Sequence, residues 1–200
     1  QPVTDSPQVA IEVPTGELAS RAQRSNTAFA AAPVVGSRPQ AEAGSLLSIV
    51  GGERSVVSRL EPLLETYSGK VHVVPDPSAA AALKLAINGL FAAQAALFAE
   101  IAGMIETSSL PTDETFELLA VLPITAPGLA RIIGLYGERR FEPNFPISLV
   151  AKDLRYLEQA AGTSGAAIPM VERALEVFET GVEEALGSFD VSGIALRYLG

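Results

Sequence analysis

The spacing of apolar residues changes near residue 76, and this change divides the chain into two regions. Before it, short runs rich in valine, isoleucine and leucine alternate with segments whose apolar residues recur every three or four positions. Gly51-Gly52 is expected to end a strand and Gly69 to end a helix. The pattern predicts an α/β arrangement, with strands at 9–13, 27–35, 46–50 and 70–74 and helices at 15–25 and 53–67.

After residue 76 the pattern is helical throughout. Asp76 can cap a long helix and Pro77 can occupy its first turn. Further helices are expected at 112–122, 126–136, 148–161 and 168–186, with a short one after Asp190. We therefore predict a mainly α fold with two domains, 1–75 with α/β strands and 76–200 all-helical, the second built on one long central helix.

The long helix is apolar on nearly every face. Between Ala79 and Gly103 only Lys84 and Glu100 carry charge, a pattern that indicates a buried helix. The stretch 85–105 is also long enough to cross a membrane, at about 20 residues. Because it contains three polar residues and is dominated by alanine, we favour the central helix of a soluble protein.

Lys84 is the most informative residue of this helix. A lysine in an apolar helix is costly unless its ammonium is paired, reaches water or loses its proton. Asn88 lies four residues later, on the same helical face. The pair is a candidate proton-transfer site. The alternative is a structural lysine whose stem is buried and whose head reaches solvent.

Composition narrows the function classes. The net charge of −9, without a cluster of Lys and Arg, argues against nucleic acid or an anionic membrane as partner. With no cysteine, disulfides and thiolate zinc sites are excluded. The one histidine, His72, argues against a multi-histidine metal site or a serine hydrolase, and we expect it half-buried in a strand. No metal site is expected.

Three short segments remain as candidates for chemistry. The Gly-x-Gly-x-x-Gly dinucleotide fingerprint is absent, and Val50-Gly51-Gly52-Glu53 lacks the spacing to hold a pyrophosphate. The candidates are the Gly-containing loop that ends at Ser37, the Lys84-x-x-x-Asn88 pair, and Phe145-x6-Lys152-Asp153. In the loop, backbone amides can approach an anion. Taken singly, each segment has a common structural explanation, namely a turn, a lysine that reaches solvent, or a surface ion pair.

Together, their order and spacing resemble the β-hydroxyacid dehydrogenase family, which includes 3-hydroxyisobutyrate dehydrogenase, tartronate semialdehyde reductase and glyoxylate reductase. The family's D-A-P-V-S-G-G is A-A-P-V-V-G-S here, from Ala31 to Ser37, and its G-x-L and V-G-G follow at 44–46 and 50–52. Its G-x-G-x-x-x-K-x-x-x-N becomes S-A-A-A-A-L-K-L-A-I-N, 78–88. Its F-x6-K-D-L is 145–154, and its closing G-x-x-D-x-S matches Gly187, Asp190 and Ser192.

The resemblance implies roles for residues at these positions. Lys84 would be the catalytic acid or base, and Asn88 would orient the substrate. The loop Val35-Gly36-Ser37 would hold the substrate carboxylate, although the family has serine where this chain has Val35 and glycine where it has Ser37. Phe145 and Lys152 would lie near NAD or NADP.

The resemblance also implies a reaction and an assembly. The substrate would be a small β-hydroxyacid, or the matching semialdehyde or keto acid, in a cytoplasmic homodimer or homotetramer. A group must take the hydroxyl proton as hydride leaves the same carbon. A neutral lysine can do so if burial lowers its pKa by about 3 units from about 10.4, a change of about 4 kcal/mol.

The resemblance begins only near residue 15, so residues 1–75 would be the C-terminal remnant of a Rossmann-like NAD(P)-binding domain. Residues 76–200 would be the all-α domain similar to that of 6-phosphogluconate dehydrogenase. We expect the chain to be the C-terminal part of a longer enzyme and inactive alone. The alternative is a non-catalytic helical dimerisation or binding module derived from such an enzyme. In both cases we expect association through the helix at 77–106, whose apolar residues cover more than one face.

Overall fold

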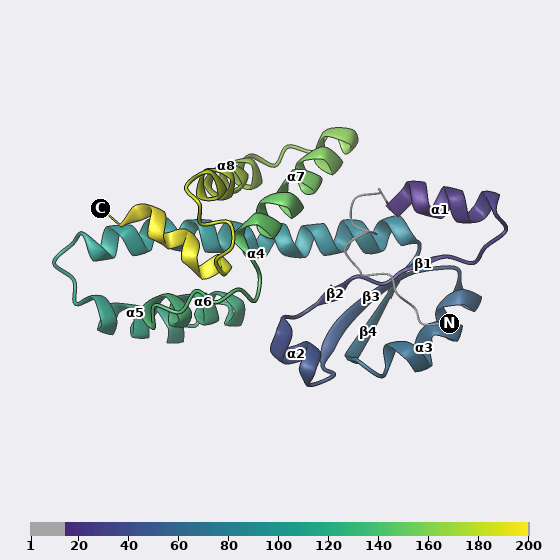
Figure 1. The fold of residues 1–200 in the computed structure, drawn as a ribbon, viewed down its shortest axis with the longest axis horizontal. Coiled ribbons are helices and arrows are strands. Elements are labelled where there is room, and N and C mark those ends of the chain that lie inside the picture. Colours follow the sequence, from purple (N-terminus) through teal and green to yellow (C-terminus); the bar gives the residue numbers. More distant parts are fainter. Residues whose placement is uncertain (1–14, 200) are drawn as a thin grey trace. The chain divides into compact units, whose positions relative to one another are not determined.

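The computed structural model describes residues 15–199 and divides into two compact units, Gln1–Lys84 and Leu85–Gly200. The strand expected at 9–13 lies outside the described residues. The fold is mainly α, with a small sheet in the first unit and helices in the second (Figure 1). The predicted fold class is therefore confirmed.

Strand β3 (Leu46–Gly52) is the centre of the sheet. On one edge it pairs in parallel with β4 (Ser68–Val74). The short strands β1 (Ala30–Ala31) and β2 (Val34–Val35) pair with it antiparallel and keep one register, so they follow each other along its other edge. The prediction of one continuous strand at 27–35 is thus wrong in detail. Pro33, which lies between β1 and β2, has no N–H to donate to β3. Its carbonyl still accepts from Ile49 N of β3 at 2.9 Å.

Three helices belong to the first unit: α1 (Thr15–Arg24), the unpredicted α2 (Arg38–Glu42) and α3 (Arg54–Leu64). Helix α3 joins β3 to the parallel β4, and its Val57 and Leu64 form a small core with Val50. The prediction that Gly69 ends this helix is wrong. The chain already pairs with the sheet at Tyr67, whose carbonyl accepts from Leu46 N, and Gly69 lies inside β4.

The expectation for His72 is also wrong, since this residue is exposed rather than half-buried. Strand β4 has an exposed pair of residues after each half-buried one. Among the described residues it pairs only with β3, as an edge strand does.

Helix α4 (Pro77–Glu106) begins as predicted, because Asp76 Oδ1 accepts from Ala79 N at 2.9 Å. By length and composition it could cross a membrane, but 44% of its most apolar stretch is buried inside the structure. The buried stripe consists mainly of small residues, namely Ala92, Ala95, Ala96, Ala99 and Ala102.

Around this stripe the second unit places two helical hairpins and a 3₁₀ helix (Figure 1). The hairpins are α5 (Thr112–Val121) with α6 (Pro127–Gly137), and α7 (Ile147–Ser164) with α8 (Pro169–Glu183), followed by η2 (Val191–Tyr198). Phe98, Phe116 and Tyr136 meet edge to face, with ring centroids 5.3 to 5.9 Å apart. Each helix lies within a few residues of its predicted position.

Candidate active site

The structure distributes the predicted site residues over both units. Val35, Gly36, Ser37 and Lys84 belong to the first unit, whereas Asn88, Phe145 and Lys152 belong to the second. Helix α4 carries both Lys84 and Asn88 without interruption, so the two side chains share one helical face. Lys84 is half-buried.

The predicted substrate loop is a tight turn between β2 and α2. Gly36 has φ 137°, a conformation that disfavours every residue with a Cβ, and a side chain there would also overlap Leu46. Ser37 precedes α2, and its backbone N–H and its hydroxyl both donate to Gln40 Oε1, at 3.0 and 2.8 Å. The loop is therefore held in one shape by its own contacts, and the Ser37 donors are engaged within it.

In the second unit, the structure brings three polar side chains together. The half-buried Asp153 of α7 accepts from Asn88 Nδ2 at 2.6 Å through Oδ2. Its Oδ1 lies 3.4 Å from Lys152 Nζ. Asn88 is only 7% exposed, so its amide is held in one orientation by a charged acceptor. Because a carboxylate accepts but does not donate, the amide nitrogen must face Asp153, and Asn88 Oδ1 points away as an acceptor.

A glycine makes this contact possible. Gly89, next to Asn88, is buried, and a side chain on it would collide with Leu157 of α7. Leu157 lies one turn after Asp153, on the same face of α7. The missing side chain at Gly89 thus lets α7 approach α4 closely, at the level where Asp153 reaches Asn88.

Phe145 precedes α7 and is half-buried. Its ring stacks on Phe91 of α4, with centroids 6.4 Å apart and planes at 24°. Phe145 is thus the residue before the N-cap of α7, and Lys152 lies in the second turn of that helix. An apolar ring, an ammonium and a fixed amide suit the nicotinamide end of a dinucleotide, with its flat ring and its ribose hydroxyls.

The Gly51-Gly52 pair does not offer a pyrophosphate site. A side chain on Gly51 would overlap the Asp76 carbonyl, and one on Gly52 would lie 2.9 Å from Ala30 Cβ. Both glycines are therefore required by close packing of the first unit on itself.

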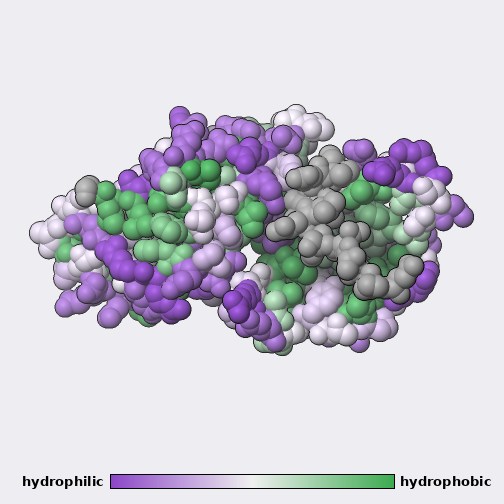
Figure 2. All heavy atoms as spheres, viewed as in Figure 1, coloured by the Kyte–Doolittle hydropathy of each residue, from purple (hydrophilic) through white to green (hydrophobic). Residues whose placement is uncertain are grey.

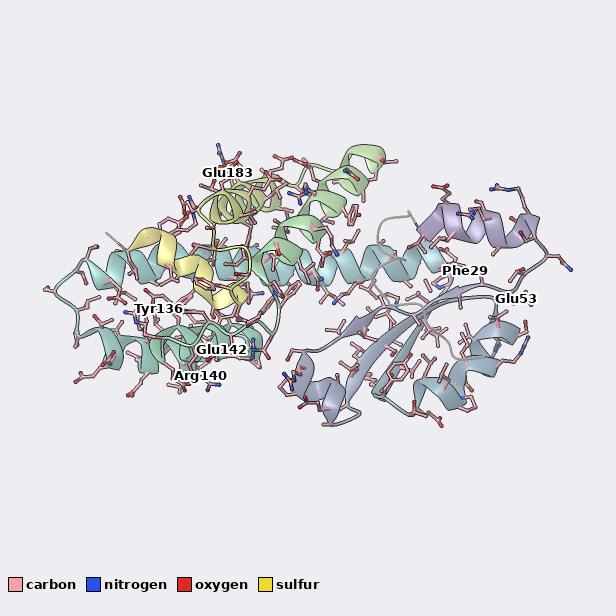
Figure 3. The ribbon with its side chains drawn as sticks, viewed as in Figure 1. Phe29, Glu53, Tyr136, Arg140, Glu142 and Glu183 are labelled. Carbon is pink, nitrogen blue, oxygen red and sulfur yellow. The ribbon has the colours of Figure 1, made fainter. Side chains whose placement is uncertain are left out.

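A separate open cleft of about 590 Å³ lies in the first unit, between α1 and the start of α3. Phe29 and Glu53, both labelled in Figure 3, are among its lining residues. None of the predicted site residues lines it. We therefore assign it no part in the candidate active site.

Sequence reasoning placed Asp153 in a motif but gave it no role. In the structure it connects Asn88 to Lys152 and is the centre of the polar cluster. In the sequence Asp153 is marked only by its position next to Lys152, and an exposed ion pair on a helix has the same pattern. Only the packing of α7 on α4 shows that its partner is an amide 65 residues earlier.

Comparisons with known proteins agree with this arrangement. Residues 78–198 match the family model described as NAD-binding of NADP-dependent 3-hydroxyisobutyrate dehydrogenase. Residues 9–75 match the NAD binding domain of 6-phosphogluconate dehydrogenase. Both models describe domains for the same cofactor class, NAD or NADP.

Individual relatives show the same likeness. The chain is 32% identical to the uncharacterized oxidoreductase YfjR of Bacillus subtilis, over 81% of this chain and 57% of that protein. It is 26% identical to the 2-(hydroxymethyl)glutarate dehydrogenase of Eubacterium barkeri, over 90% and 60%. The fold is similar to that of a 3-hydroxyisobutyrate dehydrogenase from Salmonella typhimurium, with a TM-score of 0.84, 20% identity, and coverage of 92% and 65%.

The chain spans less than two thirds of the length of each of these proteins. The longer of the two family models alone accounts for more than half of this chain. The sequence motifs, the helical second unit and the family models thus point to one group of oxidoreductases. The chain belongs to the β-hydroxyacid dehydrogenase family of NAD(P)-dependent oxidoreductases.

Proposed function

We propose that this chain supplies the substrate-binding and proton-transferring part of an NAD(P)-dependent dehydrogenase for small β-hydroxyacids, or for the matching semialdehydes or keto acids. The observation that carries the proposal is the cluster of Asn88, Asp153 and Lys152, in which a half-buried carboxylate orients a buried amide beside an ammonium. The polar groups come from α4 and α7, the same two helices that bring Phe91 and Phe145 together.

Each residue has a distinct task in this proposal. Lys84 Nζ takes the proton of the substrate hydroxyl during oxidation and returns it during reduction. Asn88, held by Asp153, presents Oδ1 to a donor on the substrate. The Val35-Gly36-Ser37 loop, held in one shape by its contacts with Gln40 and Leu46, receives the substrate carboxylate. Lys152 and Phe145 contact the nicotinamide end of the cofactor. The cofactor supplies the hydride acceptor or donor.

The class of substrate follows from the resemblance and from two relatives. One relative is named as a dehydrogenase of 2-(hydroxymethyl)glutarate and another as a probable dehydrogenase of 3-hydroxyisobutyrate, both acids with a hydroxymethyl branch. We extend this class to the present chain because its Lys84–Asn88 and Lys152–Asp153 pairs stand at the family's spacing. Cytoplasmic location and a homodimer or homotetramer are part of the same proposal.

The test is an assay of the whole protein with NAD and NADP. Short hydroxyacids are offered in the oxidative direction and semialdehydes or keto acids in the reductive direction, and absorbance of the reduced cofactor is followed. We expect hydride transfer with at least one pair. If none occurs in either direction with either cofactor, the proposed function is wrong. The 200-residue chain alone, assayed in parallel, is expected to be inactive.

The second candidate is a non-catalytic helical dimerisation module. It is favoured by the large apolar side chains that α4 leaves exposed, including Leu90 at 68% and Leu97 at 56%. This candidate predicts association without cofactor binding. The two candidates are therefore separated by the hydride-transfer assay, because both allow the chain to associate.

A further inference from the structure

Asp190 is a buried carboxylate that the proposed mechanism does not use. Its side chain is 0% exposed. Oδ2 accepts from the backbone N–H groups of Asn144 and Phe145, at 3.0 and 3.1 Å, and Oδ1 accepts from Ser192 N at 3.2 Å. The Arg131 guanidinium lies 3.8 Å from Oδ2. Charge-assisted hydrogen bonds of this kind are among the stronger ones in proteins.

The backbone around Asp190 continues this attachment. Asp190 N donates to Phe141 O and Val191 N to Phe145 O, both at 2.9 Å. In addition, Ile147 N donates to Phe189 O and Ser148 N to Gly187 O, both at 3.0 Å. These last two bonds satisfy N–H groups in the first turn of α7, which have no partner within the helix. The segment 187–192 therefore caps α7 from outside.

Surface contacts hold the same loop only weakly. Arg140 and Glu142, labelled in Figure 3, lie in the connection between α6 and α7. Arg140 pairs with Glu138 at 3.2 Å and with Glu142 at 3.9 Å, and all three side chains are at least 60% exposed. Exposed ion pairs contribute little to stability. Among the described charged groups that contact residues 141–145, the Asp190 carboxylate is the one that is fully buried.

The Asp190 carboxylate lies next to the candidate site in the structure. Phe145, whose N–H Asp190 holds, stacks on Phe91. Pro146 follows as the N-cap of α7, and Lys152 and Asp153 lie in the second turn of that helix. A shift of the first turn of α7 would therefore displace the Phe145 ring from Phe91 and the Asp153 carboxylate from Asn88.

We propose that Asp190 is a positioning residue for the candidate active site: by holding Asn144, Phe145 and the start of α7, it sets the places of the Phe145 ring and of the Lys152–Asp153 pair. It touches neither substrate nor cofactor. This inference rests on the proposed function for its effect on cofactor binding, but not for its effect on the loop.

The decisive variant is Asp190→Asn in the whole protein. An asparagine is neutral and has one side-chain oxygen, so at least one of the three N–H groups loses its acceptor and the others lose the charge assistance of theirs. Two acid-to-amide controls are matched to it. Glu142→Gln changes the same loop at an exposed side chain, and Glu176→Gln removes an acceptor of Arg173 on α8, away from the loop.

Two readouts are taken below the unfolding temperature of every variant. Amide hydrogen exchange at Asn144 and Phe145 should be at least tenfold faster in Asp190→Asn and unchanged in both controls. The dissociation constant of the reduced cofactor, followed by its fluorescence, should rise about tenfold in Asp190→Asn and less than twofold in the controls. Unchanged exchange, or faster exchange with unchanged cofactor binding, overturns the positioning role.

Failure of the proposed function gives a different result. An unsubstituted protein that neither binds cofactor nor transfers hydride overturns that function, whereas normal activity of Asp190→Asn overturns only the positioning role. If Asp190→Asn does not fold, Arg131→Met decides, because it removes the cation beside Oδ2 and leaves every hydrogen bond in place. About threefold faster exchange and about threefold weaker cofactor binding support the proposal, and parental values overturn it.

Discussion

Helix α4 presents an apolar seam that the second unit does not cover. The seam consists of Leu90, Leu97, Ile101 and Met104, exposed at 68%, 56%, 36% and 55%. Their spacings of seven, four and three residues are those of the a and d positions of a heptad repeat. Figure 2 shows that apolar residues reach the visible surface of this unit. We predict that two copies of the chain associate through this seam.

The contribution of Leu97 can be worked out from its exposure. Burying a leucine side chain completely contributes about 1.5–3 kcal/mol. With 56% of Leu97 still exposed in the single chain, its burial in an interface would contribute about 1–1.5 kcal/mol. In a symmetric dimer both copies contribute, so Leu97→Ala should weaken association by about 2–3 kcal/mol, or about 30- to 150-fold in the dissociation constant.

Leu63 of α3 is a suitable control, because it is also a helical leucine and is 59% exposed, but it lies off the seam. Sedimentation equilibrium over a range of micromolar concentrations should give at least twice the mass of one chain for the parent and for Leu63→Ala. Leu97→Ala should dissociate at concentrations that leave both intact. A parent that remains a monomer, or equal weakening by the two substitutions, would refute the reasoning.

Three further outcomes are expected. Lys84→Ala should lower kcat by about 10²–10⁴-fold with a smaller change in KM. Lys84→Arg should not restore turnover, because a guanidinium stays protonated. Parental turnover in Lys84→Arg would show that Lys84 has a structural and not a proton-transferring role. Gly103→Ala should destabilise the protein by about 1–3 kcal/mol, since the added Cβ would lie 2.9 Å from a backbone carbonyl oxygen of η2. Gly134→Ala, where the added Cβ meets open space, should stabilise it by about 0.5–1 kcal/mol. The unfolding temperatures of the two variants should therefore shift in opposite directions. Burial raises the pKa of Tyr136, so its contribution to stability is present below the ordinary tyrosine pKa of about 10 and is lost as the pH rises above it. In Tyr136→Phe, the free energy of unfolding should therefore fall less steeply over this alkaline range.

Local signals were enough to predict every described helix except the short α2. The Asp76-Pro77 start of α4 is a property of two adjacent residues, and the structure confirms it with the bond from Ala79 N to the Asp76 side chain. The helices of the second unit follow from apolar periodicity and from Gly or Pro at their ends. Such signals act within one turn or one helix, so a sequence shows them directly.

Pairings between distant residues could not be predicted in this way. The break between β1 and β2 depends on the neighbour in β3, and Gly69 marks a close approach of β4 to Ser45, with 3.2 Å from its Cβ position to Ser45 Cα, not a helix end. Asp153 accepts from an amide 65 residues earlier, and Asp190 accepts from backbone N–H groups 46 and 45 residues earlier. An acidic residue beside a lysine, or after a glycine, has the same local pattern whether its carboxylate is buried or solvated.

Helix α4 shows why one apolar segment can serve two purposes. Its first four turns carry Lys84 and Asn88, and there Gly89 lets α7 come close enough for a carboxylate to hold the amide. Its later turns bury an alanine stripe on one side and expose the leucine-rich seam on another. Because these features lie on different turns or faces, a change at Leu97 should leave the polar cluster intact. Conversely, a change at Asp153 should leave the seam intact. The apolar character that makes Lys84 unusual in the sequence thus reflects the packing of the alanine stripe and, in our prediction, association through the seam.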